Sequence, residues 1–110
     1  MDINISSQTN IPIMYLKGRF DAHEISPVRE WIKGQVETGH ARLCINLSQV
    51  TFIDSSALSA LVQGLKNCRE AGGEMVLCSL PQPVRVIFEL TRLDKAFQIF
   101  ATEEDALQAK

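Results

Sequence analysis

A polar cluster interrupts the most apolar part of this 110-residue sequence. Asp54, Ser55 and Ser56 stand together, and apolar residues dominate the segments 43–50 and 58–65 on either side. A carboxylate beside two hydroxyls can supply a nucleophile, cap a helix or accept a phosphate group. The sequence around the cluster decides which of these chemistries it supports.

The context of the cluster argues against catalysis. A serine hydrolase needs its serine in a Gly-x-Ser-x-Gly turn with histidine and acid partners, and neither Ser55 nor Ser56 has that context. A phosphoacceptor aspartate of the receiver type needs an acidic pair to hold magnesium beside it, whereas Asp21 is a lone acid close to Arg19. Glycine-rich phosphate loops are also absent from the sequence. We therefore expect a protein that is not an enzyme and that needs no metal or cofactor.

The composition indicates an ordinary globular protein. Hydrophobic residues make up 45% and charged residues 22%, and the net charge of -2 comes without the basic stripe that nucleic acid binding requires. Cys44, Cys68 and Cys78 lie far apart in apolar segments, which favours buried free thiols in a reducing compartment. The sequence shows no signal-peptide pattern and no apolar run of about 18 residues. We expect a cytoplasmic protein that binds neither nucleic acid nor membrane.

The spacing of apolar residues predicts the elements that position the cluster. Leu58, Leu61, Val62 and Leu65 recur every three or four residues, which predicts an amphipathic helix from residue 54 or 55 to Gly72. Short apolar runs bounded by turn residues predict strands. The predicted strands span 2–6, 11–18, 42–47, 74–79 and 97–100, with a turn at 8–10 and a connection at 48–51. The other predicted helices run from 21 or 23 to 39, from 81 to 93 and from 102 to 107.

The predicted order of elements is β-β-α-β-α-β-α-β-α. Strands that alternate with helices form crossover connections and pair largely in parallel, while the first two strands are close enough to pair antiparallel. We therefore expect one α/β domain over residues 1–110, with a small mixed sheet of about five strands covered by about four helices. The polar cluster then lies where a helix begins at the end of the sheet.

This position makes the cluster suitable for covalent modification. Either Asp54 or Ser55 can cap the helix by accepting a hydrogen bond from a free backbone N–H group of the first turn. A serine there is exposed to a kinase, and the helix N-terminus tolerates the charge of about -1.5 to -2 that a phosphate adds. A docked partner does not tolerate it equally, because like charges at an interface cost several kcal/mol. The residues therefore favour a binding site that phosphorylation switches.

Several segments together resemble one family, the STAS domain in its small single-domain form, the bacterial anti-sigma-factor antagonist. Residues 54–58 match four of the five positions of the family signature Asp-Ser-[Ser/Thr]-Gly-Leu at the start of a helix. Residues 18–21 resemble its Gly-x-[Leu/Phe]-Asp after the second strand, and residues 72–78 resemble its Gly-Gly before a buried strand. Residues 83–93 resemble its third helix. The resemblance covers nearly the whole chain and implies a STAS fold.

The resemblance also implies partners and roles for individual residues. In the family an anti-sigma factor that is a serine kinase phosphorylates the serine after the aspartate, which here is Ser55, with Ser56 as the alternative. The unphosphorylated protein binds that kinase and frees a sigma factor, and a PP2C-type phosphatase removes the phosphate. Asp54 would orient the serine, and the partner surface would include Asp21, Asp54, Ser56 and Ala57. The alternative is a STAS scaffold that is never phosphorylated, or a regulator of a pathway without a sigma factor.

Two residues depart from the family pattern. Ala57 stands where the signature has glycine, and its methyl group could narrow the approach of a kinase to Ser55. Arg19 stands where many relatives carry an acid, which suggests a different kinase partner, including one outside sigma-factor control.

Overall fold

The computed structural model describes residues 1–6 and 9–108. Its five-stranded sheet has the order β1-β2-β3-β4-β5, in which β1 and β2 pair antiparallel and the other neighbours pair parallel. The strands are β1 Asp2–Ser6, β2 Ile13–Phe20, β3 Arg42–Ile53, β4 Glu74–Cys78 and β5 Ile99–Phe100. The helices are α1 Ile25–Glu37, α2 Ser55–Glu70, α3 Gln82–Leu90 and α4 Glu103–Gln108, with 3₁₀ turns η1 Ala22–Glu24 and η2 Leu93–Lys95. This confirms the predicted α/β class and element order.

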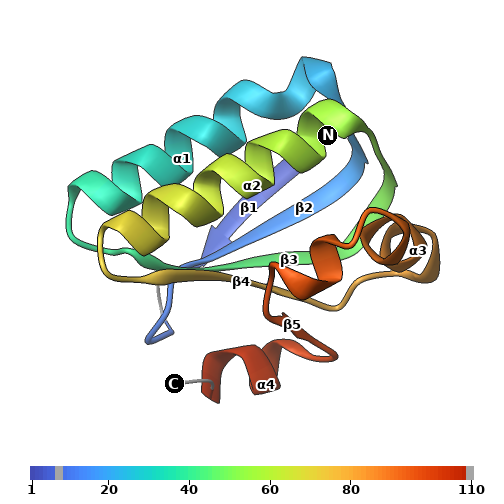
Figure 1. Cartoon of the computed structure of the whole chain (residues 1–110). Helices are drawn as coiled ribbons and strands as arrows, with labels where there is room; N and C mark the ends of the chain where they lie inside the picture. The colour runs from blue at the N-terminus through green and yellow to red at the C-terminus, as the bar shows by residue number, and fades with distance from the viewer. Residues whose placement is uncertain (7–8, 109–110) are drawn as a thin grey trace.

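The helices cover the sheet unequally (Figure 1). The helices α1 and α2 lie side by side over one face, while α4 lies against the opposite face and α3 lies beside the ends of β3 and β4. Because side chains alternate along a strand, β3 serves both faces: Leu43 and Ile45 pack beneath α1 and α2, and Cys44 packs with Ala106 of α4. The sheet that positions the site is therefore packed against buried side chains on both faces.

The predicted apolar face of α2 is confirmed. Leu58, Leu61 and Leu65 are buried, and Val62 is half-buried against the same core. The helix begins after Asp54 and its C-cap is Ala71, directly before the predicted end at Gly72. The periodicity of apolar residues was therefore sufficient to place this helix.

The end of β3 differs from the sequence prediction. Residues 48–51 were expected to form a connection, but they continue the strand to Ile53. Two register shifts between β2 and β3 each add one residue to β3, so its buried positions Leu47, Val50 and Ile53 are three residues apart instead of two. Gly18, beside the second shift, has a φ of 103°, a backbone region that favours glycine. Because buried and exposed residues do not alternate regularly here, the sequence pattern does not indicate a strand at these positions.

Other boundaries shift by a few residues. The strand predicted at 11–18 is displaced to Ile13–Phe20, the strand at 74–79 ends at Cys78, and the strand at 97–100 shortens to two residues. The last helix begins at Glu103, and Thr102 accepts a hydrogen bond from the Asp105 N–H at 3.2 Å, as a helix cap does. In the predicted turn at 8–10, residue 8 lies outside the described residues.

The three cysteines are buried free thiols, as predicted. Cys44 and Cys78 lie on neighbouring strands with their sulfur atoms 3.6 Å apart. Beside them, Asn46 donates to Glu103 at 3.1 Å and so attaches α4 to the sheet. Among the helices within the described ranges, none combines the length and the apolar character that crossing a membrane requires.

Candidate functional site

The start of α2 is held by the Asp54 carboxylate. Asp54 has the extended backbone of an N-cap residue, and its Oδ1 accepts a hydrogen bond from the Ala57 N–H at 2.9 Å. Its Oδ2 accepts a second one from the Ala22 N–H of η1 at 3.1 Å. Of the two predicted caps, Asp54 and not Ser55 performs this role. The same side chain also joins α2 to the turn that follows β2.

Asp21 performs the corresponding role for η1. Its Oδ1 accepts from the His23 N–H at 3.1 Å, and its Oδ2 lies 3.8 Å from the Arg19 Nε. The Asp54 N–H donates to the Phe20 carbonyl at 3.4 Å. Backbone hydrogen bonding between β2 and β3 therefore extends to the ends of both strands. The structure therefore brings Asp21 and Asp54 to one edge of the molecule, where Asp21 caps η1 and Asp54 caps α2.

The two serines differ in exposure. Ser55 is the first residue of α2 and is exposed, whereas Ser56 is half-buried. Within residues 1–6 and 9–108, the Ser55 hydroxyl makes no hydrogen bond. The helix start therefore presents Ser55 to solvent with its hydroxyl unengaged, while Asp54 satisfies the backbone beneath it.

Ala57 occupies the core side of the helix start. Its side chain is fully buried, and its N–H is the donor that Asp54 caps. The methyl group therefore does not project toward a kinase that approaches Ser55. Contact between a partner and Ala57 stays a prediction.

Sequence analysis overlooked Phe52 as a site residue. It pairs with Arg19 across β2 and β3, and the Arg19 guanidinium lies over the Phe52 ring, 4.0 Å from its centroid. Phe52 is 38% exposed, so part of the stacked pair is accessible from solvent. Its position two residues before Asp54 was the only available signal, because the pairing with Arg19 depends on the irregular register.

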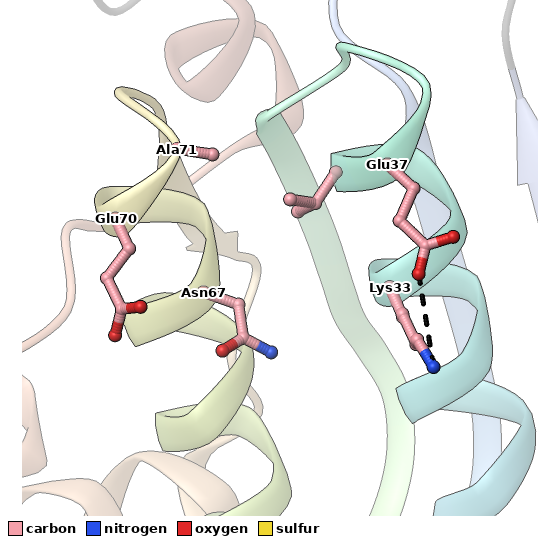
Figure 2. A pocket seen from close by; sticks show the side chains of 6 residues that line it. Lys33, Glu37, Asn67, Glu70 and Ala71 are labelled. Carbon is pink, nitrogen blue, oxygen red and sulfur yellow. Dashed lines mark ion pairs between the residues drawn. The ribbon is translucent and has the colours of Figure 1, made fainter.

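A shallow cavity lies apart from the predicted site. It has a volume of about 350 Å³ and lies between the C-terminal ends of α1 and α2. Figure 2 shows Lys33 and Glu37 of α1, which form an ion pair, and Asn67 and Glu70 of α2 among its lining residues. This cavity lies at the opposite end of α2 from Ser55, and none of the predicted site residues lines it. Across the described part of the chain, no group of three or more His, Cys, Asp or Glu side chains could hold a metal ion.

Comparison with known proteins places the chain in a family. A family model described as the STAS domain matches residues 2–106, and the chain therefore belongs to the STAS family. The anti-sigma-B factor antagonist of Listeria monocytogenes is 31% identical over 87 residues, which cover 78% of this chain and 75% of the relative. The putative anti-sigma factor antagonist BtrV of Bordetella bronchiseptica is 26% identical over 109 residues, covering 99% and 94%. Within the family, the chain groups with anti-sigma factor antagonists, which are regulatory binding proteins and not enzymes.

Solved structures agree with this fold. A putative anti-sigma factor antagonist from Thermotoga maritima superposes with a TM-score of 0.86 at 24% identity, covering 97% of this chain and 91% of that chain. The antagonist SpoIIAA in its unphosphorylated form gives a TM-score of 0.77 at 20% identity, covering 96% and 94%. SpoIIAA of Bacillus in its phosphorylated form gives 0.76 at 21% identity, covering 96% of both chains. The predicted STAS fold is confirmed.

Proposed function

We propose that this protein is a binding regulator that phosphorylation of Ser55 switches off. In its unphosphorylated form it binds a serine kinase that acts as an anti-sigma factor, and this binding frees a sigma factor. The observation that carries the proposal is the exposed Ser55 at the start of α2, beside an aspartate that already caps the helix. Because the cap is Asp54, the Ser55 hydroxyl is available for modification without loss of a structural hydrogen bond.

The fold should accept the phosphate. A phosphate on Ser55 would lie at the N-terminus of a helix of 16 residues, where free N–H groups and the helix dipole favour negative charge. The helix would therefore stay formed. Its surface would nevertheless change, because a charge of about -1.5 to -2 would join the carboxylates of Asp21 and Asp54.

This added charge would act mainly on the partner. Like charges brought together at an interface cost several kcal/mol. Since each ~1.4 kcal/mol is a factor of ten in affinity, a penalty of this size weakens binding by about a hundredfold or more. Asp21, Asp54 and Ser56 would lie within the contact surface, and so would the chain at Ala57. A PP2C-type phosphatase would restore binding.

Exposure favours Ser55 over Ser56 as the modified residue. A kinase must bring the hydroxyl oxygen to the phosphate of its nucleotide, and the half-buried Ser56 is less accessible than Ser55. In the family signature the modified serine directly follows the aspartate, and this position also favours Ser55. We further propose that residues 1–110 act as a single domain in the cytoplasm.

Phosphosite mapping tests this proposal. The protein is purified from its own cells in several growth states, and fragment-ion mass spectrometry locates any phosphate. We expect phosphate on Ser55 in part of the protein, no phosphate in the Ser55→Ala variant and retained phosphate in Ser56→Ala. The kinase is then recovered with the Ser55→Ala variant and shown to phosphorylate the wild-type protein. Absence of phosphate in every state would contradict the switch and favour a constitutive STAS scaffold.

A further inference from the structure

A chain of contacts connects an exposed arginine to the proposed phosphorylation site. The Arg19 guanidinium is stacked on Phe52 and lies beside Asp21, and the next residue after Asp21 donates its N–H to Asp54. Asp54 in turn holds the start of α2, where Ser55 lies. The stacked pair of Arg19 and Phe52, here called the Arg19 platform, is therefore continuous with the surface proposed to bind the kinase.

The Arg19 platform keeps its hydrogen-bond donors available. A guanidinium carries five N–H donors in a planar fork. The side chain of Arg19 is 63% exposed, and its Nε lies 3.8 Å from the nearest Asp21 oxygen, which is beyond hydrogen-bonding distance. Within residues 1–6 and 9–108, the Arg19 guanidinium makes no hydrogen bond, while its backbone pairs with β3. The Phe52 ring covers one face of the guanidinium and leaves its edges open.

The platform is also held in place before any partner arrives. Binding normally requires a long side chain to lose rotamer freedom, and that loss opposes association. Here the ring of Phe52 on one face and the charge of Asp21 at the edge restrict Arg19 in the free protein. Arginine and aromatic side chains are the types that most often dominate interface energetics. The pair therefore has the chemistry and the order of a recognition element.

The surroundings of Arg19 indicate what it recognises. Its planar fork matches a carboxylate in a bidentate arrangement. Asp21 compensates its charge only weakly, because the two groups are 3.8 Å apart and the Arg19 side chain is exposed to water. Because the Arg19 side chain is 63% exposed and its Nε is beyond hydrogen-bonding distance of Asp21, a carboxylate on an approaching protein can bind the guanidinium without displacing Asp21.

We propose that Arg19, positioned by Phe52, determines partner specificity by receiving a carboxylate side chain of the kinase partner. This inference rests on the proposed function, because it assigns a contact to the kinase that binds the Ser55 surface. Phosphorylation of Ser55 and the Arg19 contact then act on the same interface: the phosphate weakens the binding that the arginine selects.

The test measures the dissociation constant of the kinase that phosphorylates Ser55 for unphosphorylated variants of the full chain. We expect Arg19→Glu to weaken binding by roughly tenfold or more, because it sets two carboxylates against each other. The dissociation constant of Arg19→Lys should lie between those of the wild-type protein and Arg19→Glu, since lysine keeps the charge and lacks the planar fork. Phe52→Leu should weaken binding by roughly two- to fivefold through loss of the stacking contact.

A matched control separates a specific contact from general electrostatics. Lys66→Glu makes the same change of charge on an exposed residue of α2, three helical turns from Ser55, and should leave the dissociation constant within about twofold. Equal losses in Arg19→Glu and Lys66→Glu would overturn the proposal. Because Arg19 is exposed, the circular dichroism spectrum and the unfolding midpoint of Arg19→Glu should match those of the wild-type protein. Arg19→Lys provides a second test that preserves the charge.

The outcomes distinguish this inference from the proposed function. If Arg19→Glu binds as tightly as wild type while Ser55→Asp loses binding, the Arg19 contact is refuted and the switch stands. If Ser55→Asp also binds as tightly as wild type, the switch itself is contradicted. If substitutions of Arg19 change the dissociation constant of the phosphorylated protein only, Arg19 is an internal ligand of the phosphate. The proposed contact with the kinase is then also refuted.

Discussion

Replacing Asp54 by alanine removes two hydrogen bonds at the point where α2, η1 and the ends of β2 and β3 meet. Loss of the N-cap bond to the Ala57 N–H costs about 0.5–2 kcal/mol. Loss of the second bond, to the Ala22 N–H, costs about 0.5–1.5 kcal/mol more. We therefore expect Asp54→Ala to lower the free energy of unfolding by about 1–3.5 kcal/mol, a large part of the stability of a small domain.

Urea unfolding measures this loss. Trp31 is the only tryptophan and is half-buried in α1, so its fluorescence reports the transition. With a denaturant dependence of about 1–3 kcal/mol per molar urea, a loss of 2 kcal/mol moves the midpoint by roughly 1 M. Asp54→Ser is the matched control, because serine can still cap α2 but is too short to reach both N–H groups. It should recover about half of the loss.

An Asp54→Ala midpoint within error of wild type would refute this reasoning. It would mean that water replaces both hydrogen bonds at no net cost, and that Asp54 does not hold α2 against η1. Equal losses in Asp54→Ser and Asp54→Ala would refute the division of the effect between the two bonds.

Three further predictions concern stability and ionisation. Ser55→Ala should change the free energy of unfolding by less than about 0.5 kcal/mol, because Asp54 is the cap and Ser55 is exposed; a larger loss in urea unfolding would give Ser55 a structural role. Leu61→Ala should cost about 2–5 kcal/mol, since Leu61 is fully buried, and a loss below 1 kcal/mol would contradict its place in the core. Burial, and next the hydrogen bond to Glu103, raise the pKa of Tyr15 to about 12. Its contribution to stability is therefore complete below an unfolded pKa of about 10 and is lost as pH rises toward about 12; tyrosinate absorbance of the folded protein should show this midpoint, Glu103→Gln should lower it, and a midpoint near 10 would show that Tyr15 is not shielded.

Much of the fold follows from local patterns. The helix α2 was predictable because a run of leucines and a valine repeats at helical spacing, and the order of strands and helices limits the possible topologies. The end of β3 was not predictable in this way. Its buried positions Leu47, Val50 and Ile53 are three apart because of pairing with β2, and this irregularity comes from contacts between distant segments.

The candidate site also has features that the local sequence predicts and features that only the structure shows. An aspartate followed by two serines before an apolar helix identifies the helix start, and with it Asp54 and Ser55. The second hydrogen bond of Asp54, from the Ala22 N–H, joins residues 32 positions apart and cannot be inferred from the local sequence. The stacking of Arg19 on Phe52 depends on the irregular strand register as well. Local sequence therefore indicates the modification site, while the partner surface around it requires the structure.

We propose that a phosphate on Ser55 ends partner binding without unfolding the protein. Isothermal titration of the cognate kinase against the unphosphorylated protein and against the Ser55-phosphorylated protein tests it most directly. We predict that phosphorylation weakens binding by about a hundredfold or more, with the far-UV circular dichroism of the two forms alike. Equal affinity of the two folded forms would contradict the account.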